Sequence, residues 1–104
     1  MKFLEWKRDK WNSTQGSYLK YDKLEHLLLG FIGLLATLIF IPAGIWIDLG
    51  FWILIGTTWE IIDGTFTYDG IHIQGFSWKD LIADCFGFIL AIIVYSIYIN
   101  LLTY

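Results

Sequence analysis

Three long apolar stretches fill most of this chain and limit the folds open to it. They cover residues 22–41, 43–63 and 80–102, and the charges in them stand near their ends. A helix of about 20 residues rises about 30 Å, the thickness of a bilayer's hydrocarbon core. Only 16% of the residues are charged, whereas about a quarter are charged in a soluble domain. The sequence predicts an all-α three-helix transmembrane bundle, with 1–104 as a single membrane domain.

The first two stretches can be divided in two ways. Pro42 and Gly44 favour a turn after the first stretch, because proline lacks the amide donor that a helix needs. The alternative is one span over 27–47 that breaks at Asp48, which leaves 49–59 too short to cross a bilayer. We expect the turn at Pro42, since proline breaks a helix more strongly than aspartate does.

Two segments lie outside the apolar stretches. Residues 1–21 mix basic and aromatic side chains, which predicts an amphipathic segment, either a short helix in the headgroup layer or a solvated terminus. Residues 64–79 contain Asp69-Gly70, a pair that favours the tight turn of a β-hairpin. Ser77 is the expected N-cap of the third helix, because serine accepts a hydrogen bond from the first turn.

The basic residues predict an orientation in the membrane. Six of the seven basic residues precede residue 24, and the seventh, Lys79, belongs to the segment between the second and third stretches. Loops rich in lysine and arginine remain on the cytoplasmic side. We therefore expect a multi-pass protein of the cell membrane whose amino terminus is cytoplasmic.

Polar residues interrupt each apolar stretch at one end, in pairs with helical spacing. The pairs are Asp22 and His26, Glu60 and Asp63, and Asp80 and Asp84. Residues three or four apart share one face of a helix. The first pair begins a span, the second ends one and the third begins one. Helices running up, down and up therefore place all six ionisable groups at the same membrane face.

Five carboxylates and an imidazole cannot share a buried pocket uncompensated, because burying a charge costs several kcal/mol. A divalent metal (Mg²⁺, Mn²⁺ or Zn²⁺) would supply the compensation. The predicted metal ligands are Asp22, His26, Glu60, Asp63, Asp80 and Asp84. The candidate catalytic residues, which include a general base, are Asp22, His26, Glu60 and Asp84. Lys23 and Lys79 are the candidates for holding a phosphate. The alternative is that these groups cap helix ends and pair with one another.

The polar signatures also resemble a known family. The motifs are Asp22-Lys23-x-x-His26, Glu60-x-x-Asp63 and Gly75-Phe76-Ser77-Trp78-Lys79-Asp80-Leu81-x-x-Asp84-x-x-Gly87. They are similar to the YfiM-like small bacterial envelope proteins and, more distantly, to VanZ-like membrane proteins. The resemblance covers about residues 22–90, and its specific part is the third motif. It implies that the six positions form one site, and it implies no established reaction.

Two functions of different classes follow from these observations. The first is a membrane protein that binds a divalent metal and acts on or recognises a phosphate-bearing envelope lipid. The second is a non-catalytic membrane protein whose polar cluster fixes helix packing or mediates assembly with itself or a partner. Under either function, the expected partners are membrane lipids and a second copy of this chain. The basic amino-terminal segment is a membrane orientation signal in both, so no nucleic-acid partner is expected.

Overall fold

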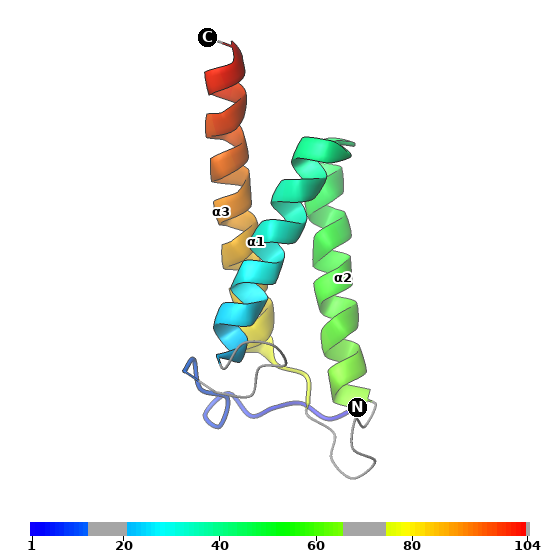
Figure 1. Cartoon of the computed structure of the whole chain (residues 1–104). Helices are drawn as coiled ribbons and strands as arrows, with labels where there is room; N and C mark the ends of the chain where they lie inside the picture. The colour runs from blue at the N-terminus through cyan, green and yellow to red at the C-terminus, as the bar shows by residue number, and fades with distance from the viewer. Residues whose placement is uncertain (13–20, 66–74, 104) are drawn as a thin grey trace.

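The computed structural model describes residues 1–12, 21–65 and 75–103, and three long helices dominate it (Figure 1). They are α1 (Asp22–Phe40), α2 (Ile45–Thr65) and α3 (Trp78–Thr103). All three are long and apolar enough to cross a membrane. The predicted all-α architecture, with three helices long and apolar enough to span a membrane, is confirmed for the described residues. The helices begin and end within two residues of the predicted ranges.

The turn between α1 and α2 stands where Pro42 predicts it. α1 ends at Phe40, and Gly44 has a φ of +122°, a conformation that side-chain-bearing residues rarely adopt. The Asp48 carboxylate accepts a hydrogen bond from the Ala43 amide (3.3 Å) and so stabilises the start of α2. The alternative span over 27–47 is therefore wrong.

Polar residues are buried in this protein and most large apolar ones are exposed. Among the described residues, the buried polar or charged side chains are ten and the buried hydrophobic ones are six. A water-soluble domain shows the reverse. In a membrane this distribution is stable, because lipid solvates the apolar surface and the polar groups satisfy one another inside the protein.

Helices α1 and α3 form the closest pair. A Cβ on Gly87 of α3 would collide with the backbone carbonyl of Leu27, and a Cβ on Gly30 would lie 2.9 Å from the carbonyl oxygen of Asp84. Small residues let helix backbones approach closely in membranes. Above this contact lies a small apolar core formed by Leu34, Leu38, Phe88 and Ala91.

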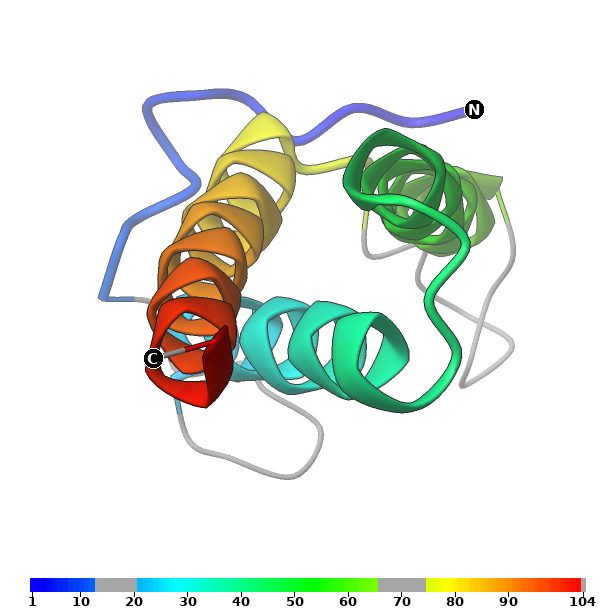
Figure 2. The ribbon, with the colours of Figure 1, turned by 90° about the horizontal axis from the view of Figure 1, so that it is seen from above.

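Helix α2 joins this pair through an aromatic side chain. The Trp52 indole covers Gly33 of α1, and its Nε1 donates a hydrogen bond to the Thr37 hydroxyl at 2.9 Å. Seen from above, the three helices leave α2 set apart from α3 (Figure 2). Helix α3 therefore packs mainly against α1, and the end of α1 tilts away from α3 towards the start of α2 (Figure 1).

The amino-terminal segment crosses beneath the helix ends (Figure 1). Residues 1–12 form a turn and no helix, so the short helix that the sequence suggests is absent from this part of the chain. Phe3 forms an isolated parallel bridge with Phe76, and the Lys2 amide donates to the carbonyl of Gly64 at 2.7 Å. This segment therefore links the end of α2 to the start of α3.

The β-hairpin expected over 64–79 is not supported. The described residues of this range belong to the end of α2, to the start of α3 and to the bridge with Phe3, and none of them lies in a strand. The expected Asp69-Gly70 turn lies outside the described residues. The backbone of Phe76 instead forms its bridge with Phe3 of the amino-terminal segment.

Candidate metal centre

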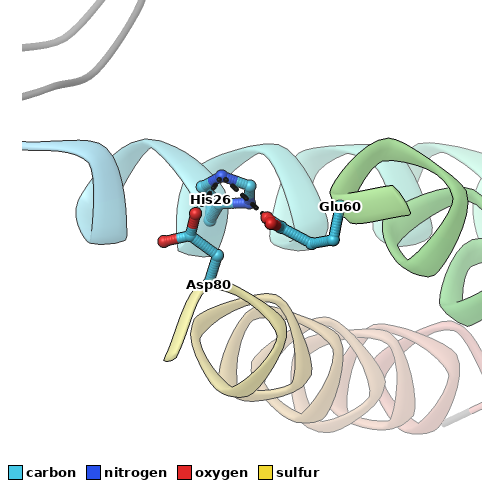
Figure 3. Close-up of side chains that lie close together, drawn as sticks. All are labelled: His26, Glu60 and Asp80. Atoms are coloured by element: carbon cyan, nitrogen blue, oxygen red, sulfur yellow. Dashed lines mark ion pairs between the residues drawn. The ribbon is translucent and has the colours of Figure 1, made fainter. Parts of the chain in front are cut away.

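The three helices each supply one side chain to a compact group at the same end of the bundle. His26 comes from α1, Glu60 from α2 and Asp80 from α3, and Figure 3 shows the three converging. One nitrogen or oxygen atom of each residue lies within 4.8 Å of the others. The convergence predicted from the order of the helix ends is confirmed for these residues. Among the described residues, this is the set whose spacing suits a metal ion.

The His26 ring uses its two nitrogens differently. Nδ1 lies 3.0 Å from Oδ1 of Asp84, within hydrogen-bond distance. Nε2 lies 3.4 Å from Oδ2 of Asp80 and 3.7 Å from Oε1 of Glu60, both beyond the usual hydrogen-bond length. When Nδ1 donates its proton to Asp84, the neutral ring presents the Nε2 lone pair to the other two carboxylates.

Glu60 is fully buried and its two oxygens have different environments. Oε2 accepts a hydrogen bond from the backbone amide of Ser77 at 3.1 Å. The Ser77 hydroxyl accepts one from the Asp80 amide at 3.0 Å, which confirms Ser77 as the N-cap of α3. Glu60 therefore satisfies a cap amide from another helix, as the glutamate of a capping box does within one helix. Oε1 has no hydrogen-bond partner and faces His26.

Lys23 is a buried cation in direct contact with carboxylates of the cluster. Its Nζ lies 2.6 Å from the Asp9 carboxylate, 2.8 Å from that of Asp22 and 2.8 Å from Oδ1 of Asp80. The lysine side chain is only 7% exposed. Charges removed from water to this degree require close partners, and Lys23 has three.

Lys79 anchors the amino-terminal segment. Its Nζ donates hydrogen bonds to the backbone carbonyls of Trp6 (3.0 Å) and Asp9 (2.5 Å). It also lies 4.5 Å from the centre of a Trp6 ring and 5.3 Å from that of Trp11. Both geometries suit a cation–π contact. The Asp9 carboxylate receives a further hydrogen bond from the Ser77 hydroxyl.

The cluster holds more negative than positive groups. The carboxylates are those of Asp9, Asp22, Glu60, Asp80 and Asp84, and the buried ammonium groups are those of Lys23 and Lys79. Lys79 is occupied by carbonyl oxygens and aromatic rings, so Lys23 and the imidazole face the five carboxylates. A bound cation would offset part of this excess.

The predicted metal ligands do not all lie in the compact group. His26, Glu60, Asp80 and Asp84 meet directly, whereas Asp22 reaches them through Lys23. Asp63 is buried near the end of α2, outside the compact group, and its carbonyl accepts a hydrogen bond from the Gly75 amide at 2.9 Å. The phosphate contact expected of Lys23 and Lys79 stays a prediction, and both ammonium groups already have protein partners.

Sequence reasoning missed Asp9 as a member of the cluster. Asp9 stands between Arg8 and Lys10, a context that indicates a solvated surface charge. In the structure it is 6% exposed and pairs with Lys23, 14 residues away. No local pattern marks such a contact. The sequence does not distinguish Asp9 from Glu5, the other acid among residues 1–12, which is exposed.

Comparisons of the chain with protein-family models, with curated proteins and with solved structures found no match.

Proposed function

We propose that this integral membrane protein binds a divalent cation between His26 Nε2, Glu60 Oε1 and Asp80 Oδ2. The observation that carries the proposal is Oε1 of Glu60, a fully buried carboxylate oxygen without a hydrogen-bond partner. Leaving such an atom unsatisfied costs about 1–3 kcal/mol, and more when it is charged. A cation in front of it removes that cost.

The distances around Nε2 fit ligands of a shared ion better than hydrogen bonds. Ligand atoms about 2.1 Å from a tetrahedral ion lie about 3.4 Å from one another. The distances from Nε2 to the Asp80 and Glu60 oxygens are 3.4 and 3.7 Å. Asp84 then takes the place of the carboxylate that commonly orients a metal-binding histidine through its other nitrogen.

The ligand set favours some ions over others. One imidazole and two carboxylates suit Zn²⁺ and Mn²⁺, whereas Mg²⁺ generally prefers oxygen ligands alone. Three protein ligands also leave a coordination position open, as in metal sites that bind a substrate or water. Zn²⁺ is therefore the ion of choice for the first measurements.

The position of the site indicates what would take the open position. The cluster lies at one end of the three helices, and if these helices cross a bilayer that end lies close to the lipid headgroups. The carboxylates repel an anionic phosphate unless a metal stands between them. We therefore propose that the metal recognises the phosphate of an envelope lipid. The third motif, which contains Asp80 and Asp84, also supports the proposed relationship to YfiM-like and VanZ-like proteins.

Metal content tests the central proposal. We expect the detergent-purified wild-type protein, loaded with Zn²⁺ and desalted, to retain a stoichiometric amount of metal by elemental analysis. Glu60→Gln and His26→Ala should retain little. Asp48→Asn is the matched control, because Asp48 is a buried acid at the opposite end of α2. A wild-type protein that retains no more metal than Glu60→Gln would refute the proposal.

Lipid binding tests the second step separately. In nanodiscs, zinc-loaded protein should bind a fluorescent phosphatidic acid more tightly than the metal-free protein does. A fluorescent diacylglycerol, which has the same tails without the phosphate, should show no such difference. Equal binding of phosphatidic acid with and without metal would refute phosphate recognition and leave the metal site standing.

The rival function, packing or assembly without a ligand, also has a specific observation in its favour. Gly30 and Gly87 bring α1 and α3 into backbone contact directly beside the polar cluster. In this case Lys23 and His26 act as internal counter-ions that hold three helices together. The rival predicts that Zn²⁺ leaves thermal stability unchanged and that Glu60→Gln changes the oligomeric state or the folding of the protein.

A further inference from the structure

Asp80 connects two halves of the polar cluster. Its Oδ1 lies 2.8 Å from Nζ of Lys23, and its Oδ2 lies 3.4 Å from Nε2 of His26. One carboxylate oxygen therefore faces an internal cation and the other faces the proposed metal position. A carboxylate rotates easily about its terminal bond, since that torsion has broad minima. Whatever holds Oδ1 thus decides where Oδ2 points.

Lys23 is itself held in place from two sides. Asp22, its neighbour on α1, lies 2.8 Å from Nζ, and Asp9 of the amino-terminal segment lies 2.6 Å from it. Asp9 is fixed in turn by the Ser77 hydroxyl and, through its carbonyl, by Lys79. These contacts restrict the flexible lysine side chain to one arrangement.

Building on the proposed metal site, we propose that Lys23 is its positioning residue. Lys23 binds Oδ1 of Asp80 so that Oδ2 faces the ion, and Asp9 holds Lys23 in the orientation that does this. Removal of a group that contacts a metal-binding side chain, without binding the metal itself, commonly lowers metal affinity 10–100-fold. The amino-terminal segment is thereby a part of the site, although it supplies no ligand.

The proposal makes a prediction whose sign is opposite to that of simple electrostatics. A lysine charge close to a bound cation repels it, so loss of that charge alone would tighten metal binding. If Lys23 positions Asp80, its loss weakens metal binding despite the removed repulsion. The direction of the change therefore separates the two roles.

Calorimetric titration of the purified protein with Zn²⁺ measures this direction. We expect Lys23→Met to bind Zn²⁺ at least tenfold more weakly than the wild type. Lys7→Met is the control, because it removes the same charge from an exposed side chain, and it should bind as the wild type does. Lys23→Arg keeps a positive charge beside Asp80 and should recover part of the affinity. Unchanged or tighter binding by Lys23→Met would overturn the proposal.

Two further variants keep the test valid if Lys23→Met does not fold. The double variant Asp22→Asn/Lys23→Met preserves the net charge and is also expected to bind at least tenfold more weakly. Asp9→Asn retains every ligand and the Lys23 charge, yet should alter the visible absorption spectrum of bound Co²⁺, which reports ligand geometry. A wild-type Co²⁺ spectrum in Asp9→Asn would contradict the proposal.

The outcomes also separate this inference from the metal site itself. A wild-type protein that binds neither Zn²⁺ nor Co²⁺ refutes both. A wild-type protein that binds Zn²⁺, accompanied by a Lys23→Met variant of equal or higher affinity, refutes only the positioning role.

Discussion

Nδ1 of His26 and Oδ1 of Asp84 lie 3.0 Å apart, so a carboxylate of α3 orients the imidazole of α1. This contact depends on how closely the two backbones approach. A Cβ on Gly30 would lie 2.9 Å from the carbonyl oxygen of Asp84 itself. Because Gly30 has no side chain, α1 can approach α3 closely enough for Asp84 to reach Nδ1 of His26. Nε2 is then the nitrogen that faces Glu60 and Asp80.

The orienting role of Asp84 predicts a graded effect on metal binding. Asp84→Asn keeps the size of the side chain and removes the charge that accepts the Nδ1 proton. We expect Zn²⁺ affinity to fall roughly 10–100-fold, with the stoichiometry unchanged, because the direct ligands remain. Calorimetric titration beside Asp48→Asn measures the effect. Complete loss of binding would instead make Asp84 a direct ligand.

Metal binding should stabilise the folded protein. A ligand at a hundred times its dissociation constant stabilises the state that binds it by about 2.7 kcal/mol. We expect Zn²⁺ to raise the thermal midpoint of the detergent-solubilised protein and EDTA to reverse this rise. Glu60→Gln should show no response to either. A metal-dependent rise of equal size in Glu60→Gln would place the ion elsewhere.

The contact between α1 and α3 should tolerate no side chain at Gly87. A Cβ there would collide with the Leu27 carbonyl and lie 2.8 Å from the Phe31 amide nitrogen. We expect Gly87→Ala to destabilise the protein by about 1–3 kcal/mol, the usual cost of overpacking. Gly50→Ala is the control, because a Cβ on Gly50 meets nothing within 4 Å. Equal thermal midpoints of the two variants would show that the helices can separate without cost.

The hydrogen bond between Trp52 and Thr37 should contribute measurably to the docking of α2. It joins Nε1 to the Thr37 hydroxyl at 2.9 Å. Trp52→Phe and Thr37→Val should each destabilise the protein, with a coupling energy of about 1 kcal/mol in a double-mutant cycle. A cycle that closes with no coupling would show that the indole docks by packing alone.

Cysteine accessibility tests the expected orientation. In a Cys85→Ser background, a cysteine in place of Lys7 and one in place of Ala43 report the two ends of the helices. The positive-inside rule predicts that a membrane-impermeant thiol reagent added to intact cells labels only the cysteine at position 43. Labelling of position 7 alone would reverse the orientation and place the polar cluster outside.

The main architecture could be predicted because its causes are local. The length and apolarity of each stretch predict a membrane-spanning helix, and Pro42 with Gly44 indicates where the first helix ends. Ser77 was identified as the N-cap of α3 from residue type and position alone. The order of the helix ends then placed His26, Glu60, Asp80 and Asp84 at one face, and the structure brings them together.

The expectations that did not hold concern segments without such periodic signals. The amino-terminal segment has aromatic and basic residues that suit a helix, yet residues 1–12 pair with Phe76 and Lys79 instead. The backbone of this segment forms hydrogen bonds with Gly64 and Phe76, and the local sequence pattern of residues 1–12 does not predict such long-range contacts. Propensity over a few residues is too weak to compete with such contacts.

The amino-acid sequence alone therefore specifies three helices, their turn and the face at which the ionisable groups gather, because hydrophobic length and helical period act over neighbouring residues. Only the folded structure decides that Asp9 joins the cluster, that Asp22 meets it through Lys23, and that one oxygen of Glu60 is left without a hydrogen bond. These outcomes depend on how closely α1 and α3 pack and on where the amino-terminal segment crosses them. Such contacts join residues far apart in the chain, and no spacing within a single helix encodes them.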